Sequence, residues 1–216
     1  MVRPKKYAIK ELFATLQGEG AQAGSPAVFL RFAGCNLGYE VCPWCDTDWV
    51  KAEYTLPLEE TLALVRRTAE EGFGAERPGL LLVATGGEPS LQLDRPLADA
   101  LRARGYRISM ESNGARPVDR SLVDWLTISP KQREFAQKEG DELKLLFTGM
   151  HAPGIAPDVE AVHRLAEGTR FRHYFLQPVD LPELGGPNYE ETVRAVMELG
   201  PPWRLSVQTH KVAQIP

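Results

Sequence analysis

Three cysteines lie within eleven consecutive positions of this 216-residue chain, at Cys35, Cys42 and Cys45, and the chain contains no other cysteine. A random scatter would seldom group them so closely, so the pattern predicts a centre that several thiolates bind together. A closed zinc site would need a fourth ligand, and all four histidines lie more than a hundred residues downstream. A cubane iron-sulfur cluster on three thiolates would keep one iron free for a ligand. A redox pair at Cys42 and Cys45 with a spare thiol is a third interpretation.

Short polar motifs follow the apolar runs of the chain, at the positions where we expect strands to end. They are GCN, TGGE, ESN, SPK, QP and QTH, which begin at residues 34, 85, 111, 129, 177 and 208. In parallel α/β sheets and barrels the carboxyl ends of the strands form the ligand-binding edge. Each motif alone is compatible with ordinary turn chemistry. Six motifs at equivalent positions favour one shared site.

Two motifs offer specific chemistry. Gly86 and Gly87 allow a ligand to approach the backbone closely, and Glu88 adds a carboxylate beside that contact, which would suit an aminoacyl group. The motif does not match the glycine-rich loops that bind nucleotide phosphates. Asp46 and Thr47, directly after the last cysteine, can cap a turn or supply oxygen ligands to a divalent cation.

Apolar runs alternate with helical periodicities along the chain, which predicts a parallel α/β sheet. Arg31 is the one charge inside the apolar run at 27–34, so it requires either an ion-pair partner or an anionic ligand. Expected strands cover 7–14, 27–34, 79–87, 106–114, 125–131, 142–149 and 171–180, with an extended piece at 203–211. Expected helices cover 58–71, 94–105, 158–168 and 189–200. The length predicts one domain over residues 1–216.

The composition argues against several classes of protein. The formal net charge is -4 and the sequence pI is about 5.7, without a cluster of basic residues, so nucleic acid is not an expected partner. The sequence has no apolar run long enough to span a bilayer and no signal-peptide core near its start, which predicts a cytoplasmic protein without a membrane partner. A reducing compartment would keep the three cysteines as free thiolates.

The combined motifs resemble those of radical S-adenosylmethionine enzymes, and specifically the 7-carboxy-7-deazaguanine synthase family of queuosine and deazapurine biosynthesis. The similarity covers nearly the whole chain through LQGEG, FLR, CDT, TGGEP, ESNG, SPK, LQP and QTHK. Six residues between Cys35 and Cys42 break the general C-x3-C-x2-C spacing, but this family accepts longer insertions there. The resemblance implies an incomplete, distorted parallel (β/α) barrel of the radical S-adenosylmethionine type.

The resemblance also implies roles for individual residues. A 4Fe-4S cluster would be bound by Cys35, Cys42 and Cys45, and Mg²⁺ by Thr47. S-adenosylmethionine would be bound by Trp44, Cys45, Asp46, Gly87, Glu88, Ser112, Ser129, Pro130, Lys131 and Gln177. The pterin substrate would contact Leu16, Gln17, Gly18, Arg31, Thr85, His210 and Pro216, with Glu19 and His210 as the catalytic candidates. A carboxylate at Pro216 would accept hydrogen bonds from the pterin, unless that end of the chain is disordered.

The implied reaction converts 6-carboxy-5,6,7,8-tetrahydropterin into 7-carboxy-7-deazaguanine with loss of ammonia. A 5'-deoxyadenosyl radical would start it by removing a hydrogen atom from the pterin. Reduced flavodoxin or a similar protein would donate the electron, and a homodimer is expected. Two alternatives remain at this point: another radical enzyme of the activase type, and a zinc-binding interaction module that uses the three cysteines and a remote histidine.

Overall fold

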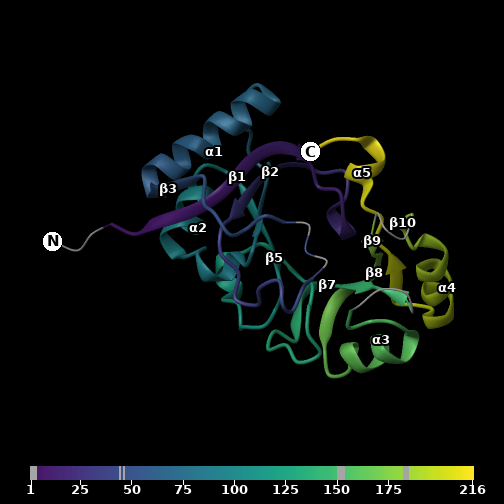
Figure 1. Ribbon diagram of the computed structural model, residues 1–216. Coiled ribbons are helices and arrows are strands. Elements are labelled where there is room, and N and C mark those ends of the chain that lie inside the picture. The colour runs from purple at the N-terminus through teal and green to yellow at the C-terminus, as the bar shows by residue number, and fades with distance from the viewer. Residues whose placement is uncertain (1–3, 44, 46, 150–153, 182–184) are drawn as a thin grey trace.

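Nine strands form one sheet in the order β11-β8-β7-β6-β5-β4-β2-β1-β3 (Figure 1). The computed structural model describes residues 4–43, 45, 47–149, 154–181 and 185–216. The strands of this sheet are β1 (Lys6–Leu16), β2 (Pro26–Phe32), β3 (Tyr54–Pro57), β4 (Leu81–Gly86), β5 (Arg107–Ser112), β6 (Trp125–Ile128), β7 (Glu139–Phe147), β8 (Arg170–Pro178) and β11 (Trp203–Leu205). A small hairpin is made by β9 (Asp180–Leu181) and β10 (Gly186–Pro187).

The sheet is parallel from β2 to β11 and antiparallel at its other edge. This confirms the expected α/β class and the incomplete barrel, because the order ends at β11 on one side and β3 on the other. The antiparallel pairing of β1 with β2 and β3 was not expected. For β1 and β2 it follows from the short connection at 17–25, which is long enough for a hairpin and too short for a parallel crossover.

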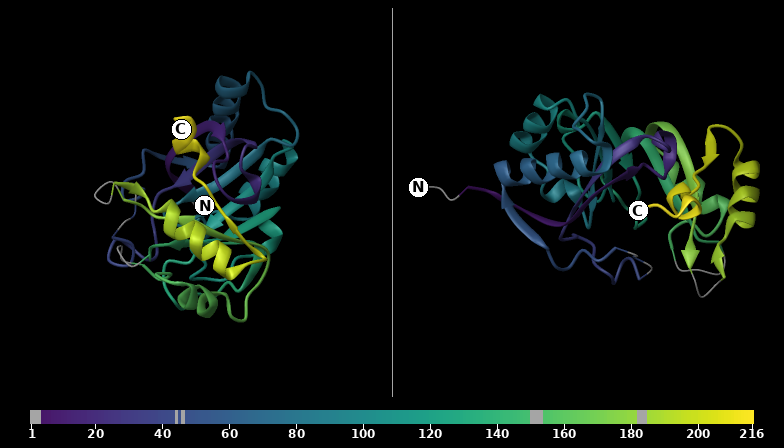
Figure 2. Two further views of the ribbon diagram at one scale, coloured as in Figure 1. Left: turned by 90° about the vertical axis from the view of Figure 1, so that its right-hand side faces the viewer. Right: turned by 90° about the horizontal axis from the view of Figure 1, so that it is seen from above.

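One face of the sheet is covered by the helices α1 (Leu58–Phe73), α2 (Arg95–Ala103), α3 (Val159–Ala166) and α4 (Tyr189–Leu199), which contribute to the core. The short helix α5 (Thr209–Ala213) does not contribute to that core. Figure 1 and the right-hand view of Figure 2 place α1 and α2 at one end of the molecule and α4 at the other. Asp94 and Asp158 cap α2 and α3 by accepting hydrogen bonds from Leu97 and Ala161 backbone N–H groups, as expected of residues at helix starts. Residues 209–211, expected to be extended, instead begin α5.

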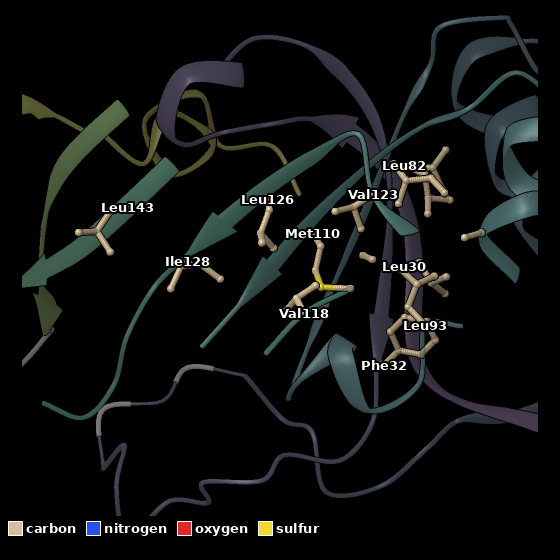
Figure 3. Close-up of a cluster of buried hydrophobic side chains, with 14 of the residues drawn as sticks. Leu30, Phe32, Leu82, Leu93, Met110, Val118, Val123, Leu126, Ile128 and Leu143 are labelled. Carbon is tan, nitrogen blue, oxygen red and sulfur yellow. The ribbon is translucent and has the colours of Figure 1, made fainter. Parts of the chain in front are cut away.

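The hydrophobic core lies between this helical layer and the sheet. Figure 3 shows side chains from neighbouring strands forming a continuous apolar layer. From β2 to β7 its members include Leu30, Leu82, Met110, Leu126 and Leu143, each fully buried. Strand side chains alternate between the two faces, so the residues next to these in sequence point to the opposite face.

That opposite face, the inner face of the incomplete barrel, carries many polar side chains. On β7, Glu142 and Lys144 alternate with the apolar Leu143 and Leu145, and all four are almost completely buried. Among the described residues, the two edge strands of the sheet, β11 and β3, do not pair with each other. Instead, the loop at 17–25 between β1 and β2, which we call the β1–β2 loop, reaches over the inner face, where Gly20 N–H donates to Ser206 Oγ at 3.0 Å.

Candidate functional site

A cavity of about 560 Å³ opens on the inner face, at the carboxyl ends of the parallel strands. Seventeen of the residues predicted for the site line it: Leu16, Gln17, Gly18, Glu19, Arg31, Cys35, Cys42, Cys45, Thr47, Thr85, Gly87, Ser112, Ser129, Lys131, Gln177, His210 and Pro216. Trp44 and Asp46 lie outside the described residues. Glu88 and Pro130 are described but do not line the cavity. The roles given to individual residues above remain predictions.

The cysteine loop forms one wall of this cavity. All three cysteines are free thiols, and Cys42 is buried. Two backbone hydrogen bonds, from Cys42 N–H to Gly38 O at 3.3 Å and from Cys45 N–H to Cys42 O at 3.0 Å, turn the chain so that the thiols share the cavity. Within the described part of the chain, no three Cys, His, Asp or Glu side chains already converge as a ligand set. The donor set of three thiols on one wall suits an iron-sulfur cluster, provided the side chains turn toward one point.

The six residues between Cys35 and Cys42 are tied to the rest of the site at two places. Asn113, at the end of β5, donates from Nδ2 to Asn36 Oδ1 at 2.8 Å. Tyr39 stacks on Trp49 with ring centroids 4.8 Å apart, and its hydroxyl donates to the Thr47 carbonyl oxygen at 3.2 Å. The insertion therefore folds back on the cysteine loop.

Arg31 has the ion-pair partner that its position in an apolar strand required, and it also lines the cavity. Its Nε donates to Glu11 Oε1 at 2.7 Å, which is the structural ion pair. Its Nη1 lies 3.4 Å from Thr47 Oγ1 on the cavity wall. At such a place the guanidinium group can bind an anionic ligand, and the hydroxyl oxygen beside it can bind a divalent cation.

The TGGE segment contributes to the site mainly through hydrogen bonds and close packing behind the cavity wall. The Glu88 carboxylate is almost completely buried and accepts hydrogen bonds from Ser112 Oγ at 2.8 Å, Asn113 N–H at 2.8 Å and Ser90 N–H at 3.0 Å. A Cβ atom on Gly87 would lie 2.1 Å from the Gly34 carbonyl oxygen. The glycine is therefore needed for close packing of this segment against the chain after β2, in addition to any approach by a ligand.

Lys131 lines the cavity near the cysteine loop, close enough to interact electrostatically with Cys42. Its Nζ donates to Ser129 Oγ at 2.6 Å and to the Ser129 carbonyl oxygen at 3.1 Å. Burial lowers the pKa of Lys131, and the nearby Lys144 cation lowers it further. Burial raises the pKa of the Cys42 thiol, while Lys131 acts in the opposite direction. A thiolate at Cys42 therefore gains from this ammonium group.

A network of carboxylates and amides forms the other end of the cavity, around Glu19 of the β1–β2 loop. Glu19 Oε2 accepts a hydrogen bond from Lys144, and Glu19 Oε1 accepts from Gln177 at 3.1 Å and from Gln208 at 2.8 Å. Burial alone would raise the pKa of Glu19, but the Lys144 ammonium outweighs it and, with Gln208 and His210, lowers that pKa to about 2. Glu19 is therefore held as a carboxylate.

His210 reaches the cavity because Gly18 has no side chain. A Cβ on Gly18 would lie 2.0 Å from His210 Nδ1. The same contact is fixed by Thr209, whose N–H and Oγ1 each donate to the Gly18 carbonyl oxygen at 2.9 Å. At the end of the chain, Thr15 Oγ1 donates to Pro216 O at 2.8 Å, and Pro216 lines the cavity.

Four polar residues of this network were given no individual role in the sequence analysis: Glu111, Glu142, Lys144 and Gln208. Glu142 and Lys144 had a usable signal. They are two charges at alternate positions of an apolar strand, which is the same pattern that drew attention to Arg31. Glu111 and Gln208 stand within or beside the motifs ESN and QTH, so their proximity to the site was foreseeable.

Comparisons with known proteins identify similar chains over nearly the full length. A 7-carboxy-7-deazaguanine synthase from Bradyrhizobium diazoefficiens is 43% identical over 217 residues, which cover 95% of this chain and 97% of that protein. One from Burkholderia multivorans is 42% identical and covers 97% of this chain and 99% of its own length. The crystal structure of QueE from Escherichia coli superimposes with a TM-score of 0.69 at 28% identity, covering 94% of this chain and 93% of that one. No protein-family model matches the chain.

Proposed function

This chain belongs to the 7-carboxy-7-deazaguanine synthase family, and from that premise we propose that the cavity on its inner face is where the family's reaction takes place. The protein is an enzyme of the radical S-adenosylmethionine type. It converts 6-carboxy-5,6,7,8-tetrahydropterin to 7-carboxy-7-deazaguanine and releases ammonia, within queuosine biosynthesis. Family membership removes the zinc-binding module and the activase as alternatives.

We place the reaction in this cavity because three chemically distinct sets of side chains line it. Three free thiols lie on one wall, the Arg31 and Thr47 pair lies on another, and the Glu19 network closes the far end. When bound, the 4Fe-4S cluster and S-adenosylmethionine supply the carbon radical that starts the reaction. The protein side chains then have to orient the pterin, exclude water and hold protons at defined atoms.

The Arg31 and Thr47 wall is proposed to hold the carboxylate of the pterin. The guanidinium group can donate to that carboxylate, and a Mg²⁺ ion at Thr47 Oγ1 would share it. Glu11 already fixes the guanidinium orientation, so little side-chain freedom is lost when the substrate binds.

Glu19 and His210 are proposed to contact the pterin ring from the far end. Both line the cavity, Glu19 as a carboxylate acceptor and His210 as an imidazole packed on Gly18. Pro216 lines the same region and is proposed to contact the pterin there.

Three further proposals come from the family resemblance: a cytoplasmic location, a homodimer, and reduction by flavodoxin or a similar protein. Among the described residues, no helix is both long and apolar enough to cross a membrane. Sedimentation of the purified protein at several concentrations tests the dimer, and a comparison of flavodoxin with a chemical reductant tests the electron donor.

The direct test of the function is anaerobic turnover. Protein with a reconstituted cluster is incubated with reductant, S-adenosylmethionine, Mg²⁺ and the carboxypterin, and the products are identified by mass. We expect 7-carboxy-7-deazaguanine and one ammonia for each pterin consumed. Cleavage of S-adenosylmethionine without loss of the pterin would contradict the assignment of substrate.

A further inference from the structure

Lys144 lies at the meeting point of two carboxylates that come from distant parts of the chain. It extends from the inner face of β7 and is 4% exposed. Its Nζ forms an ion pair with Glu19 Oε2 of the β1–β2 loop and lies 3.5 Å from Glu111 Oε2 at the end of β5. Lys144 is the cation in each ion pair that Glu19 or Glu111 makes with the described residues.

The remaining oxygens of the two carboxylates are also fixed. Glu19 Oε1 accepts from two amides, those of Gln177 and Gln208, and Glu111 Oε1 accepts from Gln17 Nε2 at 2.8 Å. Both glutamates and Lys144 line the cavity. The arrangement therefore presents two carboxylates on one wall, with the Lys144 ammonium group paired to both.

Two carboxylates that share one ammonium partner would repel each other without it, and that repulsion would move them away from these positions. Burial alone would lower the pKa of Lys144, but Glu111, Glu19 and Glu142 outweigh it and raise that pKa above its ordinary value. The neighbouring carboxylates therefore favour the charged form of Lys144.

We propose that Lys144 is a positioning residue for the substrate: it holds Glu19 and Glu111 together on the cavity wall as a pair of hydrogen-bond acceptors for the N–H groups of the pterin. This inference rests on the proposed function. A reduced pterin has several N–H donors along its fused rings, and paired acceptors at fixed separation select for such an edge. The Gln17, Gln177 and Gln208 amides keep each carboxylate in its rotamer.

The test is a double-mutant cycle on substrate binding, without turnover. Parent protein, Lys144→Met, Glu19→Gln and the double variant are reconstituted, given S-adenosylmethionine but no reductant, and titrated anaerobically with the carboxypterin by calorimetry. We expect each single variant to weaken binding by about 50-fold, as for loss of one charge-assisted hydrogen bond. We expect the double variant to bind more weakly than Glu19→Gln alone, but by less than the product of the two single losses, because Lys144 acts partly through Glu19 and partly through Glu111.

A control variant is available in Lys6→Met, which removes an exposed lysine of β1 that does not line the cavity. It should bind the pterin as the parent does. If Lys144→Met does not fold, Lys144→Gln takes its place in the cycle, since it keeps an amide donor for Glu19 and removes only the charge.

Two results would overturn the inference about Lys144 while leaving the function intact. One is a Lys144 variant whose dissociation constant for the pterin is within about threefold of that of the parent. The other is a double variant whose loss equals the product of the two single losses, which means that Lys144 and Glu19 act independently. Parent protein that fails to bind the pterin at all would instead contradict the proposed function.

Discussion

The two faces of the same sheet obey different rules in this protein. On the outer face, Leu143 and Leu145 of β7 are fully buried among apolar neighbours, and another apolar side chain of similar volume would pack in much the same way. On the inner face, Glu142 and Lys144 are just as buried, yet each depends on a specific partner from the β1–β2 loop. Ala21 N–H donates to Glu142 Oε2 at 3.0 Å. The outer face therefore determines stability, and the inner face determines which molecule can bind.

Among substitutions that test this difference between the two faces, the largest effect is expected at the cysteine wall of the inner face. Replacing Cys42 with Ala should abolish assembly of the cluster, because two thiolates cannot retain a cubane against solvent. Iron and acid-labile sulfide are measured after anaerobic reconstitution, together with circular dichroism to show that the sheet remains. The same result is expected at Cys35 and Cys45. His163→Ala on α3 is the control and should keep its iron; a full iron complement in Cys42→Ala would refute the assignment.

Substitutions on the outer face should lower the stability of the protein and leave its turnover nearly unchanged. Leu126→Ala on β6 removes a fully buried side chain and should lower the free energy of unfolding by about 3 kcal/mol. Urea titration measures this loss, and turnover per folded molecule should stay close to that of the parent. Val193→Ala on α4, where the side chain is 39% exposed, should cost less than about 0.5 kcal/mol. Equal losses at the two positions would show that the core does not lie where we place it.

Thr47→Ala tests whether the wall beside Arg31 is a metal site. We expect turnover to fall about tenfold, as for loss of one polar interaction in the reacting complex, with iron content unchanged. Mg²⁺ should stimulate the parent protein after chelation and have a smaller effect on the variant. A parent protein that is indifferent to Mg²⁺ would remove the metal from the proposal and leave Arg31 to bind the carboxylate alone.

The smallest expected effect concerns pH and the Glu19 carboxylate. Its pKa is lowered from 4.5 to about 2 in the folded protein, so its contribution to stability is complete above about pH 4.5 and is lost as pH falls toward 2. The free energy of unfolding of Glu19→Gln should therefore differ most from the parent near neutral pH, and the gap should shrink in acid. Glu190→Gln, an exposed control on α4, should show no comparable change. A gap that is constant with pH would mean that Lys144 does not depress this pKa.

Much of the outer face was predictable from sequence alone. The run at 79–87 and the alternation around Met110 required buried strands, and Asp94 with Pro96 required a helix start, so these elements were foreseen. The antiparallel edge was missed because YAIKELFA alternates in the same way whichever direction its neighbour runs. The start of α5 was missed because WRLSVQTHK has no helical periodicity.

The inner face was predictable only where motifs marked it. Sequence could name Glu19 and His210 through the resemblance, but their partners depend on which strands become neighbours. Lys144 pairs with a residue 125 positions away, and no local pattern specifies such a contact. Glu88 is the opposite case. Its motif was recognised from the sequence, but its carboxylate does not line the cavity and instead accepts hydrogen bonds from Ser112 and Asn113.

The β1–β2 loop also has a consequence for the order in which the chain folds. Its contacts with residues 206–209, between β11 and the start of α5, join residues 186 to 191 positions apart, through Gly20 with Ser206, Glu19 with Gln208 and Gly18 with Thr209. Closing so long a loop costs entropy before any contact compensates for it, so we expect these contacts to form after the parallel strands have paired. Pulsed hydrogen exchange would show late protection of Gly20 and Thr209 N–H groups. On a ribosome, the cysteine loop and most of the sheet would then exist before the far wall of the cavity, and substrate recognition would be the last property that the growing chain acquires.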